Sequence, residues 1–164
     1  MTTSLVRTRY ATPHDVAAVI DLHARCSPTT LRRRFHVPVT HVPERLVHQL
    51  VSPRGGWSVL AEQCGVVVGL ASAGPLTADA LEVGLIVEDR HQGSGVGSRM
   101  LRDVARDAHE RGYRRLVCLA EPDNDAVLPT VRRAGLEGVS EQVDGVVEVV
   151  VTLPARRRGL RRPA

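Results

Sequence analysis

The segment that most restricts the fold of this chain is an apolar strand followed by a glycine-rich turn and a long helix. Residues 81–87 are mostly apolar, and residues 92–97 then read Gln-Gly-Ser-Gly-Val-Gly. In the predicted helix, 95–111, apolar residues such as Met100 and Val104 recur at helical spacing. Glycines let the backbone approach a ligand closely, and the free N–H groups of a helix N-terminus attract phosphate. The segment therefore predicts a phosphate or pyrophosphate site, unless the glycines only ease a sharp turn.

The rest of the chain predicts helices and strands around one sheet. Strands are expected at 5–9, 57–63, 66–72, 116–120, 139–143 and 146–152, the last two joined by Asp144-Gly145. Helix starts are expected at Thr12, Ser27, Pro43, and Asp123 or Asn124. Because a helix joins 81–87 to 116–120, these two strands should be parallel. The fold class is α+β (mixed α/β), with a mostly antiparallel sheet of about seven strands and about four helices.

Helical spacing also predicts which side chains these helices bury. In the first helix Val16, Ile20 and Ala24 are four residues apart and should share the buried face. In the second, Leu31 and Phe35 should face inward, and residues 32–34, all arginine, should form a solvated face.

Composition excludes several classes of protein. The chain has 164 residues and no lysine among its 22 basic residues, which removes a P-loop and Schiff-base chemistry. Three scattered cysteines, with no C-x-x-C pair, predict neither a disulfide framework nor a metal site. No apolar run reaches the roughly 20 residues of a membrane span. The first residues lack the apolar core of a signal peptide, so we expect a cytoplasmic protein without membrane contact.

The basic charge is concentrated at the C-terminal end. Removing the five arginines of residues 155–164 from the net charge of +4 leaves −1 for residues 1–154. We therefore expect a single domain over 1–154 and a disordered, Arg-rich tail over 155–164. The tail has no aromatic residue to stack on bases, so nucleic-acid binding is a weaker alternative.

A dinucleotide site of the Rossmann type is a second interpretation of the glycine-rich turn. Glu121 ends the next strand, where such a fold places an acid that binds ribose. However, the G-x-G-x-x-G pattern fails at Ser98, and the preceding strands look antiparallel. This interpretation is therefore disfavoured.

Residues 92–97 resemble the Gln/Arg-x-x-Gly-x-Gly/Ala signature of the GNAT superfamily of acyl-CoA N-acyltransferases. The similarity extends over about residues 5–152, with Asn124 and Gly135-Leu136 similar to the later Asn…Gly-Phe segment of that family. Residues 26–35 and Glu82-Val83 further resemble segments of bacterial protein-lysine acetyltransferases. The resemblance implies a GNAT-like fold whose parallel strands, 81–87 and 116–120, splay apart.

The resemblance also implies a mode of binding for acetyl-CoA as cosubstrate. Main-chain groups of Leu85, Ile86 and Val87, at the β-bulged strand of the family, would bind the acyl and pantetheine amides. The turn and helix start would hold the pyrophosphate, and Asn124 would contact the pantetheine arm. The cofactor-binding residues expected on this basis are Leu85, Ile86, Val87, Gln92, Gly93, Ser94, Gly95, Val96, Gly97, Ser98 and Asn124.

The implied reaction is acetyl transfer to an amine, which needs a base because a protonated amine is not a nucleophile. Glu82 is our candidate, since it shares a strand face with Gly84 and Ile86; a surface carboxylate or an arginine partner is the alternative. An oxyanion donor is expected at the Ile86 N–H. One of the three arginines at 32–34 could instead line the acceptor entrance and repel basic substrates.

One residue departs from the family pattern. Many members place a tyrosine where this chain has Val131, and Tyr10 and Tyr113 lie elsewhere in the sequence. We therefore expect an N-acetyltransferase that acts by direct attack in a ternary complex, with a non-catalytic acyl-CoA-binding regulatory module as the alternative. The acceptor could be a small molecule or a protein lysine, and homodimers are common in the family.

Overall fold

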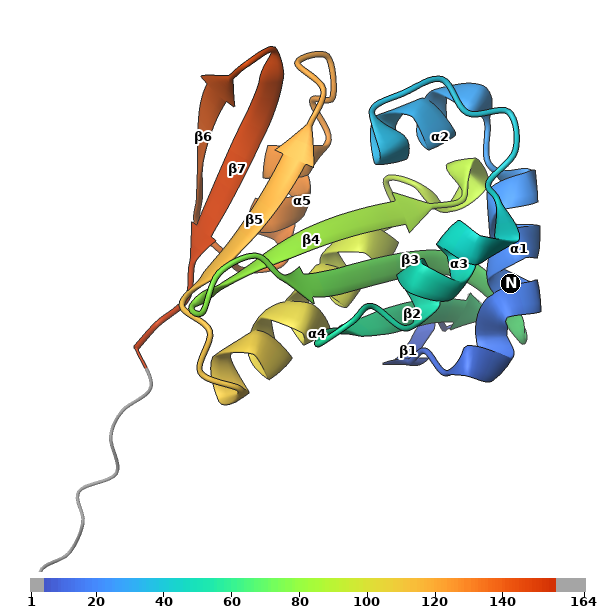
Figure 1. The fold of residues 1–164 in the computed structure, drawn as a ribbon, viewed down its shortest axis with the longest axis horizontal. Helices are drawn as coiled ribbons and strands as arrows, with labels where there is room; N and C mark the ends of the chain where they lie inside the picture. Colours follow the sequence, from blue (N-terminus) through green and yellow to red (C-terminus); the bar gives the residue numbers. More distant parts are fainter. Residues whose placement is uncertain (1–4, 156–164) are drawn as a thin grey trace, which may run out of the picture.

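Seven strands form one twisted sheet in the computed structural model, which describes residues 5–155 (Figure 1). The strands are β1 (Arg7–Tyr10), β2 (Trp57–Gln63), β3 (Val66–Pro75), β4 (Ala80–Val87), β5 (Arg115–Ala120), β6 (Gly138–Val143) and β7 (Val146–Thr152). The helices are α1 (Val16–Arg25), α2 (Pro28–Phe35), α3 (Glu44–Val51), α4 (Val96–Glu110) and α5 (Val127–Arg133), with short 3-10 turns η1 (Pro13–Asp15) and η2 (Asp89–His91). The predicted fold class is confirmed, with five α-helices rather than about four. Most of the predicted Arg-rich tail lies outside the described residues.

The sheet has the order β1-β2-β3-β4-β5-β7-β6, and its one parallel pair is β4–β5, as predicted. These two strands pair only from Ala80↔Arg115 to Glu82↔Val117. Beyond Glu82 they separate, and the two arrows diverge toward their heads in Figure 1. The second half of β4 therefore has a neighbour on the β3 side only.

Each face of the sheet is covered by its own group of helices. On one face α4 and α5 pack on a cluster that includes Leu101, Leu116 and Val149. On the other face α1, α2 and α3 enclose a second cluster that includes Leu22, Val47 and Leu60. Burial on both faces explains why β2 and β3 are nearly continuous apolar runs. Within residues 5–155 no helix is long and apolar enough to cross a membrane.

Two helices differ from their sequence predictions. In α1 the buried side chains are Val16, Val19, Leu22 and His23, whereas Ala24, predicted to be buried, is exposed. The buried stripe therefore uses three-residue as well as four-residue spacing, which the prediction omitted.

The start of α5 also differs, because the helix begins at Val127 rather than just after Asp123 or Asn124. This later start places Pro129 in the first turn, where a missing N–H costs the helix nothing. The prediction of a side-chain cap at Asp123 or Asn124 is therefore wrong.

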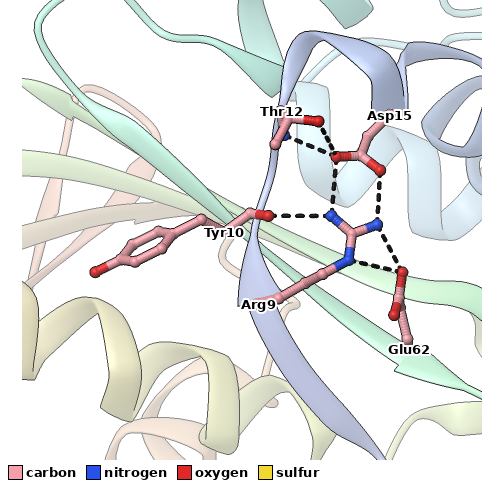
Figure 2. A network of polar contacts seen from close by, with 5 residues as sticks. All are labelled: Arg9, Tyr10, Thr12, Asp15 and Glu62. Carbon is pink, nitrogen blue, oxygen red and sulfur yellow. Dashed lines mark hydrogen bonds and ion pairs between the residues drawn. The ribbon is translucent and has the colours of Figure 1, made fainter.

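A polar network fixes the start of the chain on the sheet (Figure 2). The Arg9 guanidinium donates to Asp15 at 2.6 and 2.9 Å and to Glu62 at 2.7 Å. Asp15 also accepts from the Thr12 N–H and hydroxyl. These contacts hold the pKa of Asp15 well below its ordinary value. They raise the pKa of Arg9 above its ordinary value. The network connects β1, β2 and the start of α1.

Candidate functional site

A cleft of about 340 Å³ lies where β4 and β5 separate. It runs from Glu82 on β4, along the free edge of that strand, to the glycine-rich turn and the start of α4. Most of the predicted site residues line it: Glu82, Leu85, Ile86, Val87, Gln92, Gly93, Gly95, Gly97, Ser98 and Asn124. Ser94 and Val96 do not line the cleft. The Ser94 hydroxyl donates to the His91 carbonyl at 2.5 Å, and Val96 is buried in the core.

The glycine-rich turn presents backbone N–H groups at one end of this cleft. Gly93 and Gly95 have φ values of 72° and 90°, which side chains other than glycine rarely adopt. Gly95 is the N-cap of α4, and the first intrahelical bond runs from Arg99 N to Gly95 O at 3.0 Å. The N–H groups of the first helical turn therefore have no acceptor within α4, which suits them to bind an anion.

The free edge of β4 presents a second set of backbone groups. Glu88 N donates to Val68 O at 3.0 Å, and antiparallel partners exchange such bonds at every second pair. Ile86, opposite Leu70, therefore directs its N–H toward β3. Leu85 and Val87 point the other way, and the Val87 carbonyl accepts from Gln92 Nε2 at 2.9 Å. This alternation moves the expected oxyanion donor from the Ile86 N–H to its neighbours.

The predicted β-bulge in this strand is absent from the β3–β4 pairing. The register runs without a shift from Gly69↔Val87 to Pro75↔Leu81, and the one shift lies between β2 and β3 at Ala61/Glu62. The opening beside β4 arises from loss of the β5 partner rather than from an inserted residue.

Helix α2 crosses the mouth of the cleft and is held at both ends. At its start the Asp89 carboxylate accepts from the Ser27 N–H at 2.9 Å and from the Ser27 hydroxyl at 2.6 Å. At its end Arg32 forms ion pairs with Glu121 at 2.7 Å and Asp123 at 3.1 Å. These residues connect η2, α2 and the loop after β5. The arginines 32–34 are therefore not simply the solvated face that the sequence predicted.

Glu82 and Arg34 both line this part of the cleft. Glu82 is exposed and lines the cleft, and Arg34 extends from α2 over Gly84, two residues along β4. A Cβ atom built on Gly84 would lie 2.5 Å from the Arg34 Cζ, so any larger residue would move the guanidinium from this position. Burial lowers the pKa of Arg34, and the negative charge of Glu82 opposes that change.

Cys118 and Val131 complete the apolar wall of the cleft. Burial raises the pKa of the Cys118 thiol to about 12, so the thiol is neutral and is no nucleophile at neutral pH. Val131 is 1% exposed and lies where the family resemblance led us to look for a tyrosine. Tyr10 donates to Asp107 at 2.6 Å and Tyr113 contacts Trp57, both outside the cleft. Residues 5–155 contain no cluster of three or more His, Cys, Asp or Glu that could hold a metal ion.

The alternative that one of the arginines 32–34 lines the cleft fits Arg33 and Arg34, but the prediction did not single out Arg34, and it missed His36. Arg34 follows Leu31 by three residues and therefore lies close to the buried face of α2. That spacing was the available signal. His36, in contrast, takes a left-handed conformation with φ 59° just after the helix, which helical spacing does not predict.

The cleft lies between two splayed parallel strands, with the glycine-rich turn and the first turn of α4 at one end. The family model described as acetyltransferase (GNAT) family matches residues 17–136. The chain therefore belongs to the GNAT acetyltransferase family, whose members are acyl-CoA-dependent N-acyltransferases. Among curated protein sequences none matches this chain.

Solved structures agree with this assignment. The GNAT domain of S. lividans PAT is 27% identical, with a TM-score of 0.81 and coverage of 90% of each chain. The Salmonella typhimurium protein yncA, solved with its cofactor acetyl-CoA, is 20% identical with a TM-score of 0.72, covering 97% of this chain and 99% of that one. Ribosomal-protein-alanine N-acetyltransferase from Brucella melitensis is 24% identical with a TM-score of 0.69, covering 89% and 98%. At 20% and 24% identity the last two support the fold alone.

Proposed function

We propose that this protein is a cytoplasmic N-acetyltransferase that transfers the acetyl group of acetyl-CoA to an amine, either a small molecule or a protein lysine. The observation that carries the proposal is the pairing of two features in one cleft. The free edge of β4 offers amides to a pantetheine chain, and the turn before α4 offers unpaired N–H groups to a pyrophosphate.

The cosubstrate would lie along β4 in an extended conformation. The pyrophosphate would accept from N–H groups of residues 93–98, and Asn124 would contact the pantetheine arm from the loop after β5. The Leu85 and Val87 amides would pair with the amides of that arm as a further strand would. The thioester would then lie near Leu85, on the side of the cleft that Glu82 and Arg34 share.

The chemistry follows from those positions. Glu82 takes a proton from the ammonium group of the acceptor, directly or through water, and the free amine attacks the thioester carbon. The C–N bond forms, and the N–H of Leu85, the residue beside the thioester, stabilises the oxyanion of the tetrahedral intermediate. The positively charged amine nitrogen of the intermediate then loses its second proton to water. The C–S bond breaks, and the thiolate of CoA takes a proton from water, since Val131 cannot supply one. No covalent intermediate with the enzyme is needed.

The variant Glu82→Gln tests the role of the base. It should lower kcat by about 10²- to 10⁴-fold and leave the Kd for acetyl-CoA unchanged, because Gln cannot accept the proton. Glu141→Gln, at an exposed position on β6, is the matched control and should keep full activity. Unchanged turnover in Glu82→Gln would remove Glu82 from the mechanism.

The second candidate function is a non-catalytic acyl-CoA-binding regulatory module, which Val131 at the tyrosine position favours. The two candidates differ in one result. Tight CoA binding with no release of free thiol over a broad panel of amines would support the module and contradict the enzyme.

A further inference from the structure

The last turn of α2 contains an unusual group of buried nitrogen atoms. Arg33 Nε, Arg34 Nε and His36 Nδ1 are buried without a hydrogen-bond partner, and all three residues line the cleft. Among the described residues three other buried side-chain atoms lack a hydrogen bond; they belong to His23, Trp57 and Glu121, and the Glu121 oxygen is ion-paired with Arg32. Unpartnered polar atoms are thus concentrated at one wall of the cleft.

Arg34 is the most exceptional of the three residues. Its neighbour Arg33 donates from Nη2 to the Asp123 carbonyl at 3.2 Å, and Arg32 forms two ion pairs. Arg34 has no hydrogen bond or ion pair with any other residue of 5–155. Its guanidinium lies over Gly84, and its Cζ is 5.4 Å from the centre of the Phe35 ring. Glu82 acts on it by charge without a direct bond.

The Nε of Arg34 is buried without a partner, while the residue as a whole is half-buried at the cleft. Leaving such a group unpaired is costly, and a protein normally pairs it with an anion. An arginine stays protonated under ordinary conditions, and its planar fork matches the two oxygens of a carboxylate. The strand β4 also accommodates this arginine, because Gly84 has no side chain where the guanidinium lies. The arrangement therefore leaves donors aimed at a site where an anion can enter from the cleft.

We infer that Arg34 binds a carboxylate of the acetyl acceptor, and that the acceptor is a small amine carrying a carboxylate close to its amino group, as in a free α-amino acid. This inference rests on the proposed acetyltransferase function and narrows its acceptor. Glu82 and Gly84 lie on the same face of β4, about 7 Å apart along the strand. A carboxylate paired with the guanidinium over Gly84 thus places the adjacent ammonium group toward Glu82.

The same charges select against other acceptors. The Arg34 guanidinium repels a second cation near the amine, so a polyamine or a lysine within a basic peptide would leave this buried charge unpaired. A simple amine without a carboxylate would also leave it unpaired. The carboxylate, rather than the amine alone, should therefore determine specificity.

The test compares matched substrates on matched variants. Each of the common amino acids is paired with its decarboxylated amine, for example phenylalanine with 2-phenylethylamine and leucine with 3-methylbutylamine. Release of free CoA is measured with the full chain and saturating acetyl-CoA. The variants are Arg34→Gln, Arg34→Lys and Arg45→Gln, the last an exposed arginine on α3 that serves as a control.

The wild type should prefer at least one amino acid over its decarboxylated amine by about 10- to 100-fold in kcat/KM. Arg34→Gln should abolish that preference through KM, with less than about threefold change for the simple amine, and Arg34→Lys should restore part of it. Equal rates for both members of every pair, or loss of activity on both in Arg34→Gln, would overturn the inference. So would activity confined to a lysine peptide, or no turnover of the panel by protein that still binds CoA.

A second variant displaces Arg34 by a substitution on strand β4. In Gly84→Ala the new Cβ would displace the guanidinium, so the same loss of preference is expected with Arg34 still present. Titration of each variant with CoA distinguishes failure of the proposed acetyltransferase function from failure of the carboxylate site alone. Failure of the wild type to bind CoA contradicts the proposed function itself, whereas intact CoA binding with unselective turnover contradicts only the carboxylate site.

Discussion

The ion pair between Arg9 and Asp15 shows how one buried carboxylate contributes to stability. The Asp15 side chain is 10% exposed and that of Arg9 is 41% exposed. In Asp15→Asn the guanidinium loses its charged partner at the start of α1. We expect a loss of about 1–3 kcal/mol in unfolding free energy, moderated because solvent reaches Arg9.

The effect of Asp15→Asn should depend on pH in one direction. The folded state lowers the pKa of Asp15, so its contribution is complete above the unfolded value of about 3.9 and is lost as pH falls below it. Urea unfolding of wild type and variant should therefore differ most near neutral pH and converge in acid. A difference that grew as the pH fell would contradict this assignment.

Single residues also show what the sequence could predict of the site. Gly93 and Gly95 could be predicted because a backbone with positive φ that approaches a ligand closely requires glycine, and glycine is visible in the sequence. Glu82 was predicted from strand alternation, and it lines the cleft. One of the arginines 32–34 was expected at the acceptor entrance, but Arg34 was not singled out, because its position depends on Gly84 of a strand that is distant in sequence. Its role required the tertiary structure.

The contacts of α2 predict how that helix moves. Arg32 connects it to Glu121 and Asp123 in the loop after β5. Because Arg32 and Asp123 are partly exposed, Arg32→Ala should change the unfolding free energy by no more than about 1 kcal/mol. Amide hydrogen exchange should nevertheless become faster in α2 and in residues 121–126, with Arg45→Ala as the control. Unchanged exchange in both segments would show that these ion pairs do not hold the helix.

Helices and strands with local signals were predicted well, and those set by tertiary contacts were not. The Asp144-Gly145 turn produced the β6–β7 hairpin, and the Ser27 hydroxyl caps α2 by accepting from Thr30 N. The start of α5 was misplaced, because Asp123 is used by Arg32 and Arg33 from α2 rather than as a cap. The splay of β4 from β5 came from the family resemblance and not from the residue pattern.

Because one sheet carries a hydrophobic core on each face, we expect the protein to unfold as one cooperative unit. Leu22 lies in the cluster under α1–α3, and Leu101 lies in the cluster under α4 and α5. Both are fully buried, so Leu22→Ala and Leu101→Ala should each lower the unfolding free energy by about 2–5 kcal/mol. Because the clusters share the same strands, each variant should shift a single thermal transition. Two separate transitions in either variant would contradict a single domain.

The dimer and the Arg-rich tail stay predictions. The tail falls mostly outside the described residues, and Val139 and Val143 are exposed on the edge strand β6. Neither feature enters the binding of acetyl-CoA proposed above.

Calorimetric titration with acetyl-CoA, CoA and NADH tests that binding most directly, using wild type, Gly97→Ala and Gly97→Asp. Gly97 lines the cleft in the first turn of α4, and a Cβ there would make only ordinary contacts, the nearest at 3.6 Å from Thr130. A carboxylate in a first helical turn favours the helix, so Gly97→Asp should keep its thermal stability. The same charge should repel a pyrophosphate and weaken CoA binding by at least about 100-fold.

We expect micromolar binding of acetyl-CoA and CoA by the wild type and by Gly97→Ala, and none measurable by a folded Gly97→Asp. Equal affinity in all three proteins would show that the pyrophosphate does not lie on this turn. No binding of either CoA ligand, or a preference for NADH, would contradict the acetyltransferase proposal altogether.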